Sequence, residues 1–382
     1  MRYRSLGRCG LNISEISLGC EGLLGKPEAF IHDVIDMMES YGGTGIDLYA
    51  PNPDMRSALG RALRGRRDKF VLEAHICTIW QDGQYKRTRC MDEVRAGFED
   101  QITRLETDHV EIGMIHYVDS PDDWHKVFEG EVLRYALDLK KAGTIRAIGL
   151  SGHNPQVALA AVKSGVIDVL LFSINPCYDL QPADEDVEQL WNRDKYRGNL
   201  VNMDPERQEL YETCQRLGVG ITVMKAFGGG DLLHAERSPA GVGLTASQCL
   251  SYALDRPGVA SVFTGAHSPE ELRHNLGYAD APDDERDYAA VLATFPRISW
   301  KGHCMYCGHC APCPSGIDVA TVTKLLHLGL AQGSVPETVR EHYAALEHTG
   351  GECIQCGACE QRCPFEAAAM RNMEQAAQLF GK

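Results

Sequence analysis

Residues 108–116 read DHVEIGMIH, and residues 143–151 read GTIRAIGLS. Each is a short apolar run of strand length, and each ends in a polar residue, His116 or Ser151. Between them, residues 132–142 (VLRYALDLKKA) repeat apolar side chains at helical spacing. A strand, a helix and a second strand in this order predict a βαβ unit with parallel strands.

The same alternation extends from about residue 10 to residue 295. Further strand-like runs lie at residues 15–18, 45–48, 70–75, 169–174, 220–224 and 260–264. Segments with helical spacing separate them, such as residues 91–105 and 246–254. Eight strands alternating with helices in a chain segment of this length favour an α/β fold of the (β/α)₈ TIM-barrel type over a doubly wound sheet.

Bulk composition narrows the class of protein. The chain has 382 residues, is 44% hydrophobic and carries a formal net charge of −15. A large core is therefore available, while the acidic balance argues against nucleic acid or an anionic membrane as a partner. No secretory signal is recognisable and no apolar run reaches membrane-spanning length. We expect a cytoplasmic protein with a small-molecule substrate.

The composition changes after residue 295. Eight of the fifteen cysteines follow, together with helical patterns at residues 319–330 and 336–347. We therefore predict two domains, the barrel over residues 1–295 and a small, mainly helical domain over residues 296–382.

The eight cysteines form two runs, each closed by Cys-Pro. The second run has the C-x₂-C-x₂-C-x₃-C-P spacing of bacterial ferredoxins, and the first is one residue shorter before its last cysteine. Such spacing lets three thiolates meet one [4Fe–4S] cluster, while the cysteine before proline reaches the other cluster. Zinc sites also use C-x₂-C pairs, but the doubled run disfavours them. The predicted ligands are Cys304, Cys307, Cys310 and Cys363 for cluster one, and Cys353, Cys356, Cys359 and Cys313 for cluster two.

Several of these stretches together resemble the aldo/keto reductase family. They are residues 45–47 (GID), the strand ending in His116, residues 143–151, and residues 257–276 with the last strand and the helix after it. With the cysteine runs, the whole chain is similar to the branch of this family that carries a C-terminal ferredoxin-type domain.

The resemblance implies a catalytic set of Asp, Tyr, Lys and His. Asp47 and His116 match this set, whereas His75 stands where the family has Lys. Asn52 occupies the usual Tyr position, so Tyr49 is the candidate proton donor nearby. His75, His116, His153 and Lys225 are expected to point into the barrel mouth, and residues 80–89 are expected to cover it.

The resemblance also implies a nicotinamide site, held by a Ser-Asn pair and a Gln. Here the sequence reads Ser151-Gly152, and Leu171 stands at the Gln position. The phosphate end is better preserved, because Ser268 begins a predicted helix with a capping box. The expected cofactor-binding residues are Ser151, Gly228, Gly229, Gly265, Ala266, His267 and Ser268.

Iron–sulfur clusters carry single electrons, whereas aldo/keto reductases move a hydride. This difference favours an iron–sulfur oxidoreductase with a flavin (FMN or FAD) in the barrel and Asp47, His75, His116, Tyr49 and Lys225 as catalytic residues. A ferredoxin or flavodoxin would be a suitable redox partner protein. Two alternatives stay open, an NAD(P)H-dependent aldo/keto reductase with altered acid residues and a non-enzymatic electron-relay subunit of a larger complex.

Overall fold

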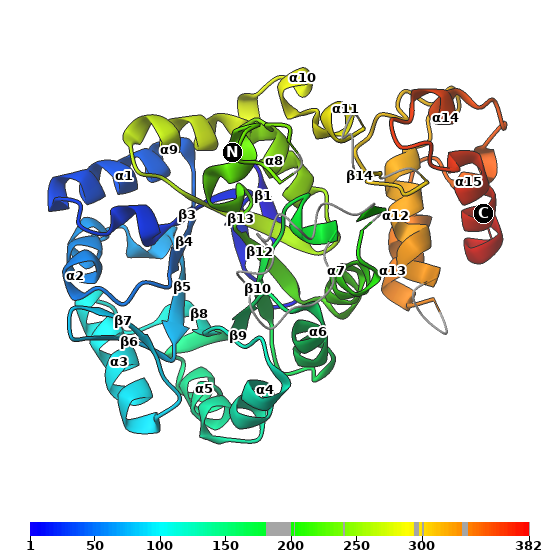
Figure 1. Ribbon diagram of the computed structural model, residues 1–382. Coiled ribbons are helices and arrows are strands. Elements are labelled where there is room, and N and C mark those ends of the chain that lie inside the picture. Colours follow the sequence, from blue (N-terminus) through cyan, green and yellow to red (C-terminus); the bar gives the residue numbers. More distant parts are fainter. Residues whose placement is uncertain are drawn as a thin grey trace.

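Eight parallel strands in the described part of the chain close into a barrel (Figure 1). This computed structural model describes residues 1–180, 200–201, 203–239, 241–293, 298–299, 302–330 and 335–381. Around the barrel the strands follow the order β10-β12-β13-β3-β4-β5-β8-β9. Their bounds are β3 Ile16–Gly19, β4 Gly45–Leu48, β5 Val71–Ile76, β8 Val110–Ile115, β9 Ile145–Gly152, β10 Val169–Ser173, β12 Gly220–Met224 and β13 Val259–Gly265. The predicted (β/α)₈ fold is confirmed.

Helices cover the outside of the barrel. They are α1 Glu28–Tyr41, α2 Pro53–Ala62, α3 Met91–Arg104, α4 Pro121–Phe128, α5 Glu131–Ala142, α6 Pro155–Lys163, α7 Pro205–Leu217, α8 Ala246–Leu254, α9 Pro269–Leu276, α10 Asp283–Arg286 and α11 Tyr288–Leu292. Local sequence sets several of their ends. Gly143 adopts a left-handed conformation (φ 81°) and stops α5, and Asn154 caps α6 ahead of Pro155.

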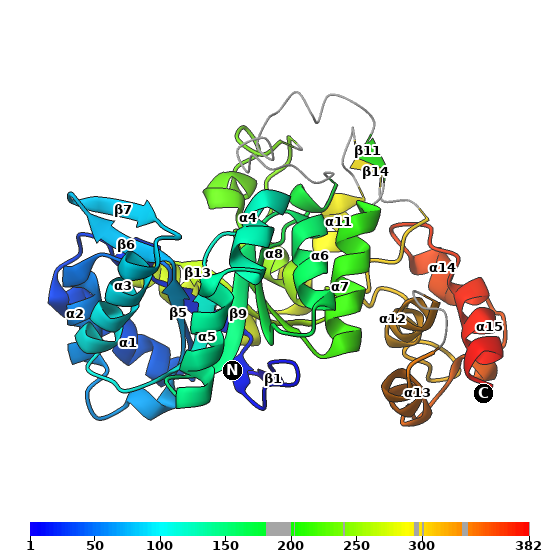
Figure 2. The same cartoon turned by 90° about the horizontal axis from the view of Figure 1, so that it is seen from below.

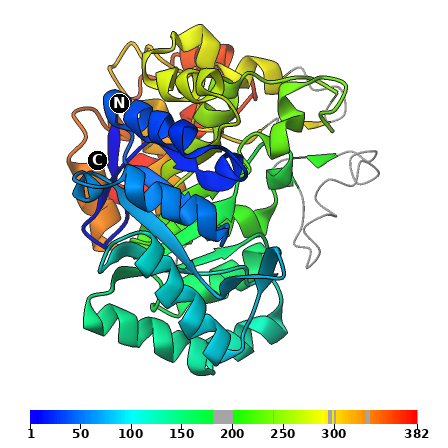
Figure 3. The ribbon, with the colours of Figure 1, turned by 90° about the vertical axis from the view of Figure 1, so that its left-hand side faces the viewer.

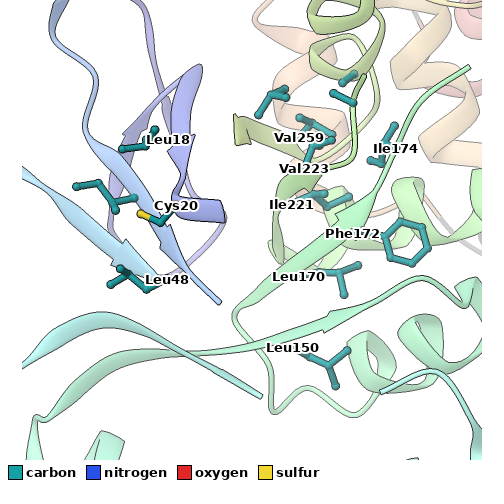
Figure 4. Packing of buried hydrophobic residues seen from close by; sticks show 14 of the residues in the cluster. Leu18, Cys20, Leu48, Leu150, Leu170, Phe172, Ile174, Ile221, Val223 and Val259 are labelled. Atoms are coloured by element: carbon teal, nitrogen blue, oxygen red, sulfur yellow. The ribbon is translucent and has the colours of Figure 1, made fainter. Parts of the chain in front are cut away.

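Two apolar layers hold the barrel together. The outer layer lies between strands and helices and includes Leu150, Leu170 and Ile221 on three neighbouring strands (Figure 4). The inner layer fills the barrel and includes Val71, Ile112 and Leu171. Because side chains alternate along a strand, the inward face of β5 presents Val71, then Glu73, then His75. Apolar packing below therefore gives way to polar groups toward the carboxyl ends.

Two hairpins mark opposite ends of the barrel (Figure 2). Strands β1 (Tyr3–Ser5) and β2 (Asn12–Ser14) pair ahead of the first barrel strand. Strands β6 (Thr78–Gln81) and β7 (Gln84–Arg87) follow β5 directly and lie at the carboxyl ends. The second hairpin corresponds to the segment that we expected to cover the mouth. A further pair joins β11 (Leu200–Val201) to β14 (Ile298–Ser299).

The C-terminal residues form a separate group of helices. These are α12 Val319–Leu330, α13 Glu337–Ala344, α14 Ala358–Arg362 and α15 Ala369–Phe380. They share an apolar cluster of their own, which includes Val322, Leu326 and Met373. The group lies on the side of the barrel away from α1 and α2, and α12 contacts α7 (Figure 1 and Figure 3). The expected domain boundary near residue 296 falls outside the described residues.

None of the helices in the described ranges combines the length and the apolarity that crossing a membrane requires.

Candidate active site

Four side chains at the barrel mouth form one hydrogen-bonded chain. Asp47 lies on β4, His75 on the neighbouring β5, and His116 directly after β8. The Asp47 Oδ1 atom lies 2.8 Å from His75 Nε2, and His75 Nδ1 lies 2.7 Å from His116 Nδ1. His116 Nε2 lies 2.8 Å from the hydroxyl of Tyr85. The chain thus runs from a carboxylate inside the barrel to a tyrosine on the hairpin.

Burial falls along this chain. Asp47, His75 and His116 are 7%, 1% and 8% exposed, whereas Tyr85 is 41% exposed. The first three groups are therefore shielded from water, whereas Tyr85 also faces solvent. We call Asp47, His75, His116 and Tyr85 the mouth relay.

Burial also fixes the charge at the mouth. The pKa of His116 is held well below its ordinary value, because burial and the neighbouring His75 disfavour a positive charge. Glu73 lies one inward position below His75 and is fully buried. Its pKa is raised well above the ordinary value by burial and by the charge of Asp47.

The two tyrosines at the mouth have different partners. The hydroxyl of Tyr49 donates to Glu21 Oε1 at 3.2 Å, and its ring stacks on His116 at a centroid distance of 6.1 Å. Tyr85, not Tyr49, lies within hydrogen-bond distance of His116. The sequence patterns do not single out Tyr85 as a catalytic residue. The signal available for Tyr85 is its position in residues 80–89, the segment expected to cover the mouth.

A second polar group lies beside the relay. His153 Nδ1 lies 2.7 Å from Asp119 Oδ2, and the main-chain N–H of Asn154 donates to Asp119 Oδ1 at 3.0 Å. The side chain of Asn154 is occupied in capping α6. Lys225 is positioned by a left-handed backbone (φ 59°), and burial lowers its pKa despite the nearby acidic side chains of Asp119 and Glu21.

The expected carboxamide residues do not gather into a pocket. Ser151 Oγ accepts the main-chain N–H of Tyr117 at 2.9 Å, and Gly152 supplies no side chain. Leu171 is buried in the apolar interior of the barrel. The family's Ser-Asn pair and Gln therefore have no equivalent set of amides here.

The expected phosphate end is a well-capped helix terminus. Ser268 Oγ accepts the N–H of Glu271 at 3.2 Å, and Glu271 Oε2 accepts the N–H of His267 at 2.8 Å. A carboxylate thus already occupies one donor of the terminus. Gly265 is exposed, Ala266 is buried, and Lys26 Nζ donates to the His267 carbonyl at 3.0 Å.

The triple glycine lies after β12, in a separate turn. Gly228, Gly229 and Gly230 all have positive φ, which side-chain-bearing residues rarely adopt in succession. No atom lies within 4 Å of a Cβ placed on Gly229. The glycines are explained by the turn itself.

Comparison with known proteins assigns the barrel to a family. The family model "Aldo/keto reductase family" matches residues 27–247. The chain belongs to the aldo/keto reductase family. It is 28% identical to YqkF, an uncharacterized oxidoreductase of Bacillus subtilis strain 168, over 79% of this chain and 99% of that protein. It is also 28% identical to the aldo-keto reductase YhdN of the same organism, over 76% of this chain and 94% of YhdN.

Solved structures of the family share the fold. The holo form of the aldo-keto reductase AKR11C1 from Bacillus halodurans matches with a TM-score of 0.58 and 22% identity, over 75% of this chain and 95% of that chain. The family match and the relatives at the sequence level make the protein an oxidoreductase of the aldo/keto reductase type.

The C-terminal cysteines surround two cavities outside the barrel. Each cavity is lined by three cysteines of one run and by the last cysteine of the other run. The first is lined by Cys304, Cys307, Cys310 and Cys363, and the second by Cys313, Cys353, Cys356 and Cys359. Cys359 also borders the first cavity. Among the described residues, no three His, Cys, Asp or Glu side chains converge tightly enough to hold a metal ion.

The two cysteine runs share left-handed residues at two equivalent positions. Tyr306 and Gln355 have φ values of 58° and 55°, and Gly308 and Gly357 have φ values of 82° and 74°. Each pair occupies equivalent positions in its run. Left-handed residues in such loops turn main-chain N–H groups toward a concavity, which suits an anionic iron–sulfur group. The N–H of Ala367 also points to Cys363 Sγ at 3.4 Å.

The four cysteines predicted for each cluster line one cavity each and match the ligand number of a [4Fe–4S] cluster, although the described side chains do not converge on a single ion. Burial raises the pKa of the Cys304 and Cys307 thiols to about 12, although main-chain N–H groups act in the opposite direction. Buried thiols around a cavity become thiolates readily only when a cation joins them. The cluster ligands stay a prediction, since the ferredoxin-type domain has no counterpart in the family match.

Proposed function

We propose that the barrel mouth reduces a carbonyl group of a small substrate, and that the mouth relay delivers the proton. The observation that carries this proposal is the unbroken series of hydrogen bonds from Asp47 to Tyr85. Membership of the aldo/keto reductase family supports the reaction class. The relay takes the place of the family's catalytic Tyr and Lys. At the corresponding positions this sequence has Asn52 instead of Tyr and His75 instead of Lys.

The direction of donation in the relay follows from the charge of Asp47. When Asp47 is ionised, His75 Nε2–H donates to it, His116 Nδ1–H donates to His75, and Tyr85 donates to His116. When Asp47 is protonated, each hydrogen bond of the relay runs in the opposite direction. The hydroxyl hydrogen of Tyr85 can then point toward a substrate. Proton delivery converts the second arrangement into the first.

Each step of this conversion moves one proton between adjacent atoms. Tyr85 protonates the substrate oxygen and recovers a proton from His116 Nε2. His116 Nδ1 receives a proton from His75 Nδ1, and His75 Nε2 receives one from Asp47. The low pKa of His116 favours these neutral forms, because an imidazolium at the centre of the relay would hold the proton.

The source of the electrons has two candidates. Aldo/keto reductases use NAD(P)H as hydride donor, and the relatives point to a nicotinamide rather than to a flavin. The residues at this mouth do not match that cofactor well, since Gly152 and Leu171 replace its amide contacts and Glu271 occupies the helix terminus.

The second candidate source is the C-terminal region. We infer that residues 302–381 hold two [4Fe–4S] clusters in a ferredoxin-type domain, with four cysteines at each of the two cavities. When bound, such clusters supply single electrons. The two left-handed positions that the runs share and the N–H···S contact of Cys363 support this assignment.

Anaerobically purified protein provides the test. We would measure iron, sulfide and flavin content, and then reduction of a panel of aldehydes and ketones with NADPH or with dithionite-reduced protein. Reduction with NADPH alone supports the nicotinamide route, and reduction only by dithionite-reduced, iron-loaded protein supports the cluster route. No reduction with either donor, together with a stable protein partner in pull-downs, would overturn the proposal in favour of an electron-relay subunit.

A further inference from the structure

A buried arginine of the barrel domain is hydrogen-bonded to the first cysteine loop. Arg256 follows α8 and is fully buried. Its Nη2 atom donates to the Met305 carbonyl at 2.5 Å, and its Nε atom donates to the Tyr252 carbonyl at 3.1 Å. Met305 lies between Cys304 and Cys307, two of the proposed ligands of cluster one. The cation is therefore held against the loop that would carry that cluster.

Aromatic rings and nearby acids both stabilise the charge of Arg256. Its guanidinium lies 4.5 Å from the ring centroid of Tyr252 and 5.7 Å from that of Tyr306. Burial disfavours the cation, but Tyr288, Tyr252 and Asp255 outweigh this and hold its pKa above the ordinary value. Arg256 thus stays charged in the interior.

Other charged groups face the same loop. Lys324 on α12 lies 5.9 Å from the Tyr306 ring centroid. Three acids oppose these cations. Asp255 accepts a hydrogen bond from Tyr288 at 2.8 Å, Asp318 acts on Cys310, and Asp287 Oδ2 lies 2.8 Å from Nε2 of His309 inside the loop. Of the two cations, Arg256 donates a hydrogen bond directly to the Met305 carbonyl of this loop.

The second cavity has different surroundings. Cys356 is exposed, and the neighbouring Ile354 is 65% exposed. Two charged neighbours of this run are acidic, Glu352 before Cys353 and Glu360 after Cys359. Arg362, directly before Cys363, donates to the carbonyls of Cys310 and Pro312 in the first run, but its side chain is exposed and water screens its charge.

We propose that Arg256 gives cluster one a higher reduction potential than cluster two, so that electrons entering at the exposed cluster two move inward toward the barrel. Net charge, hydrogen bonding and solvent exposure set the potential of such clusters. Reduction adds a negative charge, which a buried cation stabilises far more than an exposed one. This inference rests on the proposed clusters and adds the order of electron flow.

The electron balance is simple. A low-potential one-electron donor protein, such as a reduced ferredoxin or flavodoxin, reduces cluster two by one electron. That electron then passes to cluster one, which is reduced while cluster two is reoxidised. No bond forms or breaks in this step, and Arg256 keeps its proton throughout.

Potentiometric titration followed by electron paramagnetic resonance tests the inference on the intact holoprotein. In the unaltered protein, the cluster bound by the first cavity is expected to be reduced first, and Cys363→Ser identifies its signal. Arg256→Met is expected to lower the reduced-to-oxidised ratio of cluster one about tenfold or more at a fixed potential, a shift of about 59 mV for one electron. Arg256→Lys should restore most of the shift.

Arg362→Gln is the matched control, because it removes an exposed cation that also contacts two loop carbonyls. It should move the ratio much less than Arg256→Met. If Arg256→Met lost its cluster, Lys324→Met would carry the same test, with a fall in the cluster-one ratio again expected. An unchanged ratio, or a shift no larger than that of Arg362→Gln, would overturn the inference. Absence of iron from the unaltered protein would instead overturn the proposed clusters.

Discussion

Replacing Tyr85 by phenylalanine removes the outer end of the mouth relay and little else. The hydroxyl of Tyr85 contacts His116 Nε2 at 2.8 Å, and the side chain is 41% exposed. One half-exposed hydrogen bond contributes roughly 1 kcal/mol or less to folding stability. Loss of a general acid lowers turnover by about 10²–10⁴-fold, which corresponds to about 2.7–5.4 kcal/mol of activation free energy. The effect on turnover should therefore exceed the effect on stability.

The assay measures turnover of a carbonyl substrate that the unaltered protein reduces, alongside chemical denaturation of both proteins. Tyr49→Phe is the matched control, because it deletes the same atom from a tyrosine whose ring centroid lies 6.2 Å from that of Tyr85. The Tyr49 hydroxyl bonds to Glu21 and not to His116, so its loss should change turnover only a few-fold.

The reverse outcome would refute the relay. If Tyr85→Phe kept full turnover while Tyr49→Phe lost it, Tyr49 would be the proton donor, as the sequence alone suggested. Equal losses in both variants, together with a fall in stability, would indicate a structural role for the tyrosine pair.

Three further predictions concern pH, the cysteines and the buried charges. The pKa of His116 in the folded protein lies below the ordinary histidine value of about 6.5, so below this pH the unfolded chain binds more protons than the folded protein. The free energy of unfolding, measured by denaturation, should therefore decline as the pH falls from about 6.5 toward the folded pKa, by up to about 1.4 kcal/mol per pH unit for this group. No decline between pH 7.5 and 5.5 would contradict it. Cys363→Ser should abolish the signal of cluster one and spare cluster two, whereas the exposed Cys90→Ser should leave the iron content unchanged. Asp179→Ala should cost about 3–5 kcal/mol in thermal or chemical unfolding, because it leaves fully buried Arg207 without its carboxylate at 3.5 Å; a loss below 1 kcal/mol would contradict the pairing.

The barrel was predictable because each strand carries a clear local signal. Residues 145–152 and 169–173 form strands within one or two residues of the predicted ranges. In both cases a buried apolar run is bounded by a helix with a defined cap. Parallel strands that are covered by helices are buried and therefore require such apolar runs. Eight apolar runs that alternate with helices are compatible with few folds besides the (β/α)₈ barrel.

The site was predictable only in part. Asp47, His75 and His116 stand at strand ends, where the barrel topology brings them together. Tyr85 could not be placed from its sequence position, because it lies in a hairpin whose direction depends on packing over the mouth. The role of Arg256 was equally hidden, since its contact with Met305 joins residues 49 positions apart.

The most direct test of the account is His116→Ala, measured for iron content and turnover in the same preparation. His116 connects the inner pair of the relay to Tyr85 and lies far from the cysteine loops in the sequence. The account predicts an unchanged iron content and a turnover about 10²–10⁴-fold lower than that of the unaltered protein. Full turnover in this variant would show that the chemistry does not take place at the barrel mouth.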